Sequence, residues 1–217
     1  DQNFSEALLL GVEAYLHAKD NQTSNFTAQS AMTKIVQSNP GLIQVILGHT
    51  DWVNTLAVSP DGNLLASGGW DTIVNLWDIS NPAFPMEMPS LIAHTTPVEG
   101  LAFSSDGKTL ATSGNDNLIL WDTSDPSAPK MLSKIEGYYL HPQFAQGNKI
   151  LSSLQNNNDA NNVGVLFNVS DRESPVELSQ LDSRDKAVNL DNLMLSPARN
   201  LAFTLLRNGN VLGWDIA

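Results

Sequence analysis

The chain contains no cysteine, so disulfide bonds, thiol catalysis and cysteine-bound metals are excluded. Basic residues are also scarce: 11 Lys and Arg stand against 23 Asp and Glu, which gives a formal net charge of −12. So negative a surface repels phosphate, which argues against nucleic acids and anionic membranes as partners. No apolar run approaches the roughly 18 residues of a membrane-spanning helix, and no signal-like leader is present. We therefore expect a cytoplasmic protein, because the lack of cysteine suits a reducing compartment.

Common catalytic motifs are missing as well. The sequence has no Gly-x-Ser-x-Gly element and no glycine-rich loop that ends in Gly-Lys-Ser/Thr. Any NTPase activity would therefore belong to a domain upstream of this chain. We expect no catalytic residues, no metal and no cofactor. What the chain does have is 41% hydrophobic residues over 217 positions, enough to build a substantial core.

A dipeptide repeat organises this hydrophobic content. Trp-Asp occurs at Trp77, Trp121 and Trp214, and Phe167-Asn168 stands where a further copy is expected. The aromatic positions 77, 121, 167 and 214 are 44, 46 and 47 residues apart. A period in this range indicates small β-sheet units that must stack to bury their apolar faces.

The first two units align residue by residue. Residues 48–62 match residues 93–107, and both stretches place a histidine near the start and an Asp-Gly turn at the end. In each unit a hydroxyl residue follows the histidine by 18 positions, an Asp follows four later, and a Trp comes five or six after that. A histidine, a hydroxyl, a carboxylate and an indole can satisfy one another's hydrogen bonds when buried.

These motifs resemble the WD-repeat family, whose four-stranded propeller blades carry Gly-His early and Trp-Asp late. The resemblance implies a buried hydrogen-bonded tetrad in each of the first two units, formed by His49, Ser67, Asp71 and Trp77 and by His94, Thr112, Asp116 and Trp121. The histidines could instead bind metal, and the two Asp could act as an acid–base pair, but their repeat spacing favours the structural role. In the later units Ile135 and Lys186 replace the histidine, so complete tetrads are not expected there.

The resemblance also implies a surface for partners. In WD-repeat proteins, partners contact residues that flank the start of the first strand of a blade, and the residue before the tetrad Asp. In this sequence these six rim residues are Trp52, Asn54, Trp70, Pro97, Glu99 and Asn115. The corresponding residues of the fourth unit are Asn189, Asp191 and Arg207. Two tryptophans on one rim indicate protein binding, because Trp is enriched at interface hot spots, although they could also simply cover a blade edge.

The first 40 residues differ from the rest. Apolar residues at helical spacing, a polar break near residues 20–25 and Asn39-Pro40-Gly41 predict a helical hairpin or linker over residues 1–40. Residues 6–15 are similar to the helical linker that precedes WD repeats in large bacterial signalling proteins, which often carry an NTPase or kinase domain upstream.

From residue 41 the apolar pattern has the period of β-strands. We divide this part into a lone outer strand (41–47), blade 1 (48–92), blade 2 (93–136), blade 3 (137–181) and an incomplete blade 4 (182–217). The outer strand of blade 1 is expected at 86–92. The fold class is thus mainly β, a β-propeller of about four blades. It could close as a four-bladed ring, but we favour a partial arc of a larger propeller, which would leave apolar faces exposed.

Three functions remain open on the sequence alone. The first is a non-catalytic WD-repeat scaffold or sensor module that binds a protein partner, within a larger bacterial signalling protein. The second is a regulatory propeller that controls its own upstream NTPase or kinase domain. The third is a propeller enzyme with a site in the central channel, which would need converging carboxylates or histidines outside the structural positions.

Overall fold

The computed structural model describes residues 44–156, 162–181, 190–196 and 200–216. This part of the chain is built from β-strands and turns and holds no helix that could cross a membrane. The chain divides into two compact units, Asp1–Thr50 with Asn81–Pro85, and Asp51–Ser80 with Met86–Ala217. Every strand belongs to the second unit. The predicted mainly β fold is therefore confirmed, whereas the predicted helical hairpin (1–40) lies outside the described residues.

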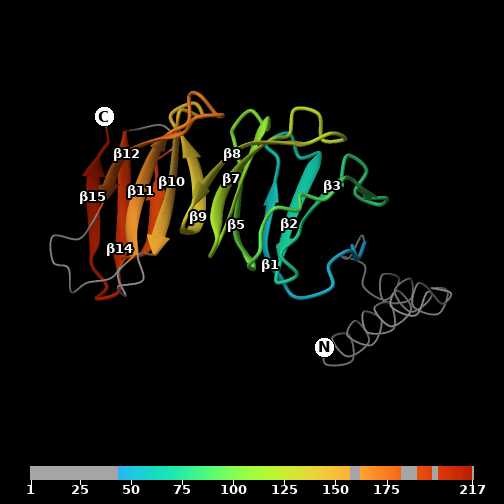
Figure 1. The fold of residues 1–217 in the computed structure, drawn as a ribbon, viewed down its shortest axis with the longest axis horizontal. Helices are drawn as coiled ribbons and strands as arrows, with labels where there is room; N and C mark the ends of the chain where they lie inside the picture. Colours follow the sequence, from blue (N-terminus) through green and yellow to red (C-terminus); the bar gives the residue numbers. More distant parts are fainter. Residues whose placement is uncertain (1–43, 157–161, 182–189, 197–199, 217) are drawn as a thin grey trace. The chain divides into compact units, whose positions relative to one another are not determined.

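The first two sheets are four-stranded antiparallel meanders (Figure 1). The first contains β1 (Val53–Val58), β2 (Leu64–Gly69), β3 (Val74–Asp78) and β4 (Met86–Glu87). The second contains β5 (Val98–Phe103), β6 (Thr109–Gly114), β7 (Asn117–Asp122) and β8 (Lys130–Glu136).

The later sheets repeat this order (Figure 1). The third sheet contains β9 (Tyr138–Ala145), β10 (Ile150–Asn156), β11 (Asn162–Asn168) and β12 (Val176–Leu181). The fourth has three strands, β13 (Leu190–Leu195), β14 (Leu201–Leu206) and β15 (Val211–Asp215). We call the edge at which the first strand of each sheet begins the rim edge, and the other the opposite edge.

The first hairpin of each of the first two sheets has the same turn. The Ser59 hydroxyl lies 2.6 Å from Asp61 Oδ1 and accepts a hydrogen bond from the Leu64 amide at 2.9 Å. Ser104 repeats both contacts with Asp106 and Thr109 at the same distances. The glycine after each Asp has a positive φ, 75° in the first turn and 69° in the second. These turns explain why the Asp-Gly motif ends a strand and starts the next one.

Two predicted strands differ from the structure. Residues 44–47 form no strand, since they pair with no other strand among the described residues. The outer strand expected at 86–92 is only Met86–Glu87, followed by an isolated bridge between Val74 and Leu91. Pro89 interrupts it, since proline has no amide hydrogen for the ladder.

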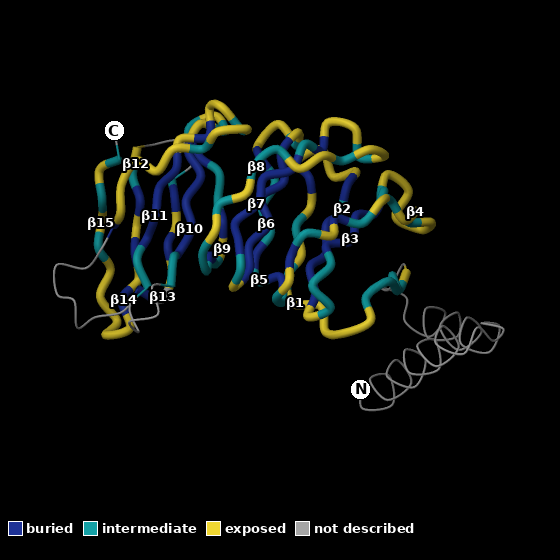
Figure 2. The backbone as a smooth tube through the Cα atoms, in the orientation of Figure 1, coloured by how far each residue is buried: buried dark blue, intermediate teal, exposed yellow. Residues whose placement is uncertain are grey.

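The hydrophobic core lies between neighbouring sheets (Figure 2). Strand β6 shows the consequence, because all six of its residues are buried. A strand with a sheet on each side must be apolar or small on both faces, which removes the simple alternation expected of a half-exposed strand. By contrast, β1, β14 and β15 keep an alternating burial pattern.

The first strand of each sheet contains an irregularity in its register. The register shifts at Asn54 in β1, at Glu99 in β5 and at Asp191 in β13, so each of these residues lacks a direct partner in the second strand. In β9 the shift falls in the middle of the strand, at His141, whose φ is 50°, and Pro142. A β-bulge redirects side chains. In the first two sheets the bulges therefore set Asn54 and Glu99 apart from the regular ladder.

Candidate functional site

The second sheet holds a continuous hydrogen-bonded network. His94 comes from the loop between β4 and β5, Thr112 from β6, Asp116 from the β6–β7 turn and Trp121 from β7. His94 Nδ1 lies 2.8 Å from Asp116 Oδ1, and His94 Nε2 lies 2.8 Å from Thr112 Oγ1. Trp121 Nε1 donates to the same Thr112 oxygen at 3.0 Å. The structure thus brings together the four residues assigned to the second tetrad.

The network has one arrangement of hydrogens that uses every group once. The Trp121 indole can only donate, so the Thr112 oxygen accepts from it. The Thr112 hydroxyl hydrogen is then free to point to His94 Nε2, and we assign the imidazole hydrogen to Nδ1, where it is donated to Asp116. His94 and Thr112 are buried, so each lost bond would leave an unpaired polar group without water.

Asp116 is the terminal acceptor of this network. Besides His94, it accepts from the Thr95 amide at 2.7 Å, the Thr95 hydroxyl at 3.1 Å and the Thr96 hydroxyl at 3.2 Å. Burial acts to raise the pKa of Asp116, but the hydrogen bonds from His94 and Thr95 outweigh it and hold the pKa well below its usual value. A carboxylate saturated with donors is a poor proton acceptor at neutral pH, so this geometry is structural.

The indole-to-hydroxyl bond recurs in other sheets. Trp77 donates to Ser67 at 3.1 Å, and Trp214 donates to Thr204 at 2.9 Å. In all three sheets the hydroxyl residue lies two positions after the residue that pairs with the Trp. The third sheet has Phe167 instead of Trp, and its equivalent Ser153 donates to the Leu140 carbonyl at 2.7 Å.

The first tetrad is described only in part. Trp77 and Ser67 form the bond given above, and Asp71 Oδ1 accepts from the Ile73 amide at 3.3 Å. His49 belongs to the other compact unit. None of His49, Ser67 and Asp71 is without a partner. The pairing of His49 with Ser67 and Asp71 stays a prediction. Within the described residues, no group of three or more His, Asp or Glu side chains could hold a metal ion.

The rim residues of the first sheet form an exposed aromatic pair. The Trp52 side chain is 74% exposed and that of Trp70 is 49% exposed. Their ring centroids are 5.7 Å apart with a tilt of 50°. The Trp70 amide also donates to the Trp52 carbonyl at 2.8 Å, which fixes the two backbones side by side. The structure thus brings together two tryptophans that are 18 residues apart in the sequence.

The turn that follows Trp70 is strained. Thr72 has a φ of 69°, a region that β-branched residues rarely adopt. The equivalent position of the fourth sheet, five residues before its Trp, is Gly209 with a φ of 86°. Strain of this kind persists only where the surroundings hold it, and it is concentrated at functional sites. The Trp70 turn is therefore held in one conformation.

The rim residues of the first and second sheets are directly linked. Asn54 Nδ2 donates to Glu99 Oε2 at 2.6 Å and to the Val98 carbonyl at 3.2 Å. Tyr138, at the start of β9, lies close to the same carboxylate: burial and the charge of Glu99 raise the pKa of Tyr138. Tyr138 was not predicted as a rim residue, because only the stacking of sheets brings it to Glu99.

The remaining rim residues are less well placed for binding. Pro97 is half-buried, and the Asn115 amide donates to Thr96 Oγ1 at 3.1 Å while the residue itself is exposed. They lie beside the second tetrad and share none of the contacts of the Trp pair. In the fourth unit, Arg207 is exposed in the β14–β15 turn, and Asn189 lies outside the described residues.

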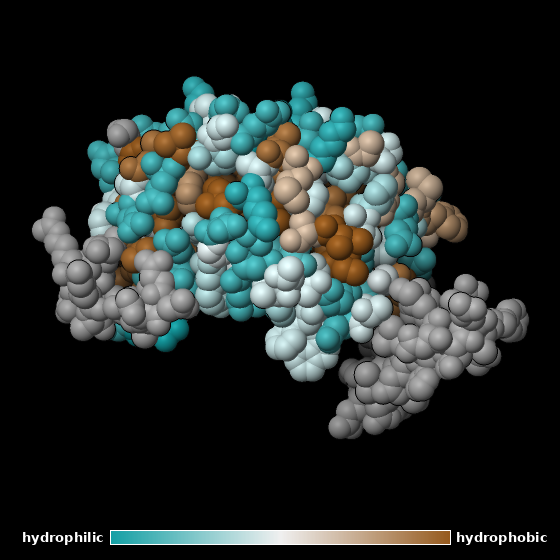
Figure 3. Space-filling view, in the orientation of Figure 1, coloured by the Kyte–Doolittle hydropathy of each residue, from teal (hydrophilic) through white to brown (hydrophobic). Residues whose placement is uncertain are grey.

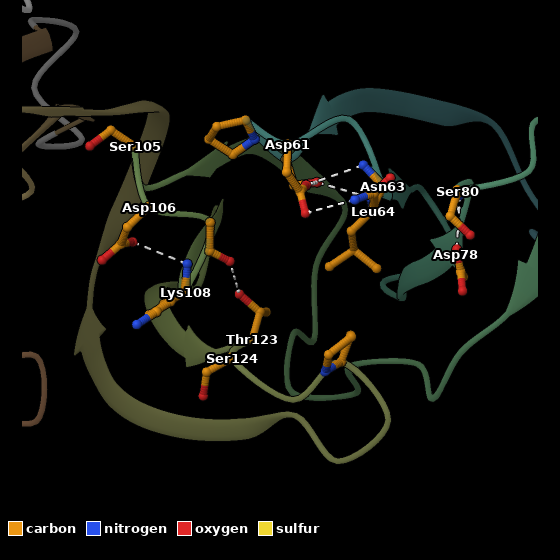
Figure 4. A pocket seen from close by; sticks show the side chains of 14 residues that line it. Asp61, Asn63, Leu64, Asp78, Ser80, Ser105, Asp106, Lys108, Thr123 and Ser124 are labelled. Carbon is orange, nitrogen blue, oxygen red and sulfur yellow. Dashed lines mark hydrogen bonds between the residues drawn. The ribbon is translucent and has the colours of Figure 1, made fainter.

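The opposite edge carries a groove of about 610 Å³ between the first two sheets (Figure 4). Asp61, Asp78 and Asp106 line it, but each carboxylate accepts hydrogen bonds within its own turn, from Asn63, Ser80 and Lys108 backbone amides respectively. These hydrogen bonds show that the three carboxylates stabilise their own turns. The groove therefore shows no arrangement that points to chemistry.

The tetrad predicts a specific stability effect. Thr112→Val keeps the volume of the side chain but removes the hydroxyl that links Trp121 to His94, so we expect the free energy of unfolding to fall by about 1–3 kcal/mol. Thr112→Ser is the matched control, because Ser67 performs the same role in the first sheet. Urea unfolding measures both variants. A Thr112→Val protein as stable as Thr112→Ser would contradict the role of the hydroxyl.

The carboxylate predicts a pH dependence. The pKa of Asp116 is lower in the folded than in the unfolded chain, where it is about 3.9. Its stabilising contribution is therefore fully present above that value and is lost as the pH falls below about 4. Asp116→Asn should be less stable than the original chain at pH 7, and the difference should shrink towards pH 3. Thermal melts across this range test it; a difference independent of pH would exclude the ionised carboxylate as its source.

Comparisons with known proteins agree with this geometry. The family described as "WD domain, G-beta repeat" matches residues 41–78 and 87–122. The chain is 56% identical over 43 residues to small ribosomal subunit protein RACK1z of Arabidopsis thaliana. The matched stretch covers 20% of this chain and 13% of that protein. The chain is 61% identical over 33 residues to cross-pathway control WD-repeat protein 2 of Flammulina velutipes, covering 15% of this chain and 10% of that protein.

The fold has a counterpart among solved structures. A chain from the crystal structure of the mitotic checkpoint complex superposes with a TM-score of 0.64 at 20% identity, over 78% of this chain and 52% of that chain. At this identity the likeness concerns the fold alone. Residues 41–78 and 87–122 are thus WD repeats, and the similar WD-repeat proteins and the shared fold support a WD-repeat β-propeller for the chain.

Proposed function

We propose that the chain is a non-catalytic protein-interaction scaffold that binds a protein partner through its rim residues. The observation that carries this proposal is the exposed pair of Trp52 and Trp70. Tryptophan is rare on surfaces without a function and frequent at binding hot spots, since its large rigid ring gives contact area for little loss of entropy. The pair is already formed in the free chain, so a partner would not have to order it.

The name of one similar protein supports a role in an assembly. RACK1z is named as a protein of the small ribosomal subunit, which is a large assembly. The matched stretch spans only 13% of RACK1z, so the partner of this chain does not follow from that name.

We further infer that the described sheets form an arc of a larger propeller. The main contacts between sheets join each sheet only to its neighbours in chain order. On the first sheet Leu56 and Val58 are more than half exposed, and on the last Met194 and Val211 are 61% exposed. Figure 3 shows hydrophobic side chains at the surface over the first sheet. Such faces are normally covered by another sheet.

A second candidate is a regulatory propeller within a larger bacterial signalling protein, which would control its own upstream NTPase or kinase domain. The similarity of residues 6–15 to the helical linkers of such proteins favours it. The gene upstream of the codon for Asp1 tests this candidate. A reading frame that encodes neither kind of domain would exclude it.

The scaffold predicts that partner capture depends on the Trp pair. The double variant Trp52→Ala/Trp70→Ala should lose proteins that the original chain captures from an extract of its source cells, because the preformed contact surface is gone. Cooperative unfolding should be retained, since both side chains are exposed. Met131→Ala is the control, because Met131 is 45% exposed on the outer strand β8. Quantitative mass spectrometry compares the captured sets, and unchanged capture by the double variant would refute the rim assignment.

If the described sheets form an arc, the isolated chain should self-associate through the uncovered apolar faces of its first and last sheets. Leu56→Ser/Phe203→Ser should weaken this association, because it removes apolar groups from the first and last sheets, where Phe203 is 43% exposed. Sedimentation velocity over a range of concentrations measures the effect, with Met131→Ser as the control. A folded chain that stays monomeric at every concentration would favour the closed ring instead.

A further inference from the structure

We propose that the segment bound at the rim is extended and basic, with a Lys or Arg side chain against the indoles of Trp52 and Trp70. This inference rests on the proposed function, because it specifies the chemistry of the partner at the same residues. Three features of the rim edge support it: the distribution of charge, the geometry of the indoles, and two oxygen atoms at the same edge.

The rim edge of the first three sheets is acidic. Its described strand ends and connecting segments contain five carboxylates, Asp51, Asp71, Glu99, Asp116 and Glu136. Across residues 51–54, 69–74, 88–99, 114–117 and 136–138, there is no Lys or Arg. The opposite edge of these sheets also carries carboxylates, such as Asp61, Asp106 and Asp171, but there they are mixed with basic residues, Lys108 and Lys149 in hairpin turns and Arg172, which donates to Thr109 Oγ1 at 2.8 Å. In the fourth sheet Arg207 lies at the rim edge. A cationic segment is therefore attracted to the rim edge and an anionic one is repelled.

The indoles provide the short-range contact. A cation over the face of an indole is attracted by the negative charge of the ring face, and Arg and Lys are the protein cations that make this contact. Trp52 exposes most of its surface, and the 50° tilt against Trp70 leaves the two faces at an angle to each other. The bond between their backbones keeps the two residues side by side before a partner arrives.

Two oxygen atoms at the same rim edge could hold the polar part of the segment. Asn54 follows Trp52 by two residues and uses its Nδ2 group to hold Glu99 Oε2. Within the described residues, no hydrogen bond reaches Asn54 Oδ1 or Glu99 Oε1. These oxygens can accept from an ammonium or guanidinium group or from the amides of an extended segment. A basic segment carries donors of this kind.

Titration of the 217-residue chain with defined peptides tests the proposal. The probes are short capped peptides of Gly and Ser that carry several Lys, several Arg or, as the neutral match, several Gln. We expect binding of the Lys and Arg peptides that weakens as salt is added, and at least tenfold weaker binding of the Gln peptide. Trp52→Ala/Trp70→Ala should weaken binding of the basic peptides by about tenfold or more.

The indole N–H signals of the nuclear magnetic resonance spectrum locate the contact. The chain has five tryptophans, of which Trp77, Trp121 and Trp214 donate to hydroxyls within their sheets. Basic peptides should therefore shift only the signals of Trp52 and Trp70. Shifts confined to the other three indoles would overturn the proposal.

A charge-matched pair of variants separates a site from general attraction to a negative chain. Glu99→Gln and Glu173→Gln each remove one negative charge, but Glu173 lies in the β11–β12 connection at the opposite edge. We expect about fivefold weaker binding for Glu99→Gln and no change for Glu173→Gln. Three results would each overturn the proposal that the partner is basic: equal effects of the two variants, equal binding of the basic and neutral peptides, or no binding at all. If the Trp double variant still loses its cellular partners in any of these cases, the scaffold function stands without it.

Discussion

The hydrogen bond from an indole on the third strand to a hydroxyl on the second is the polar interaction that three of the four described sheets share. It occurs at the same register position in the first, second and fourth sheets. In the second sheet it continues through His94 to Asp116, so it joins two strands, the preceding loop and the following turn. Because Asn115 directly precedes Asp116, the buried network of the second sheet and its exposed rim share the same turn. Rigidity inside the sheet thus becomes preorganisation at its edge.

The third sheet shows what replaces the network when the indole is missing. Phe167 has no hydrogen to donate, and the equivalent hydroxyl of Ser153 turns to the Leu140 carbonyl. The ring of Phe167 packs instead against Tyr139, with centroids 5.9 Å apart and planes at 69°. An edge-to-face contact of this kind supplies energy but does not tie a loop to the sheet. The repeat can therefore lose its tetrad and keep its place in the stack.

The sequence predicted the strands of the central sheets well, because alternation, Asp-Gly turns and the Trp-Asp period all mark the same boundaries. The prediction was wrong where a strand depends on pairing with another segment, because pairing cannot be read from the local sequence. Residues 44–47 pair with no described strand, and the strand expected at 86–92 ends before Pro89. At the rim, too, residue positions could be predicted from the sequence but contacts between sheets could not. Trp52 and Trp70 were identified from repeat position, but the bond from Asn54 to Glu99 and the approach of Tyr138 arise from the stacking of separate sheets.

The negative charge of the rim edge suggests how the rim would select and hold a partner. A net charge of −12 acts over a distance of about one Debye length, roughly 8 Å at physiological salt, and attracts any cationic segment without discriminating among them. Discrimination needs contacts that act only at touching distance, and at the rim these are the two indole faces and the oxygens of Asn54 and Glu99. In this proposal long-range charge would control mainly the rate of encounter, whereas the Trp pair would control how long the complex lasts. Since the rim side chains are carried by the sheet beneath them, recognition would then depend on the same turns as fold stability.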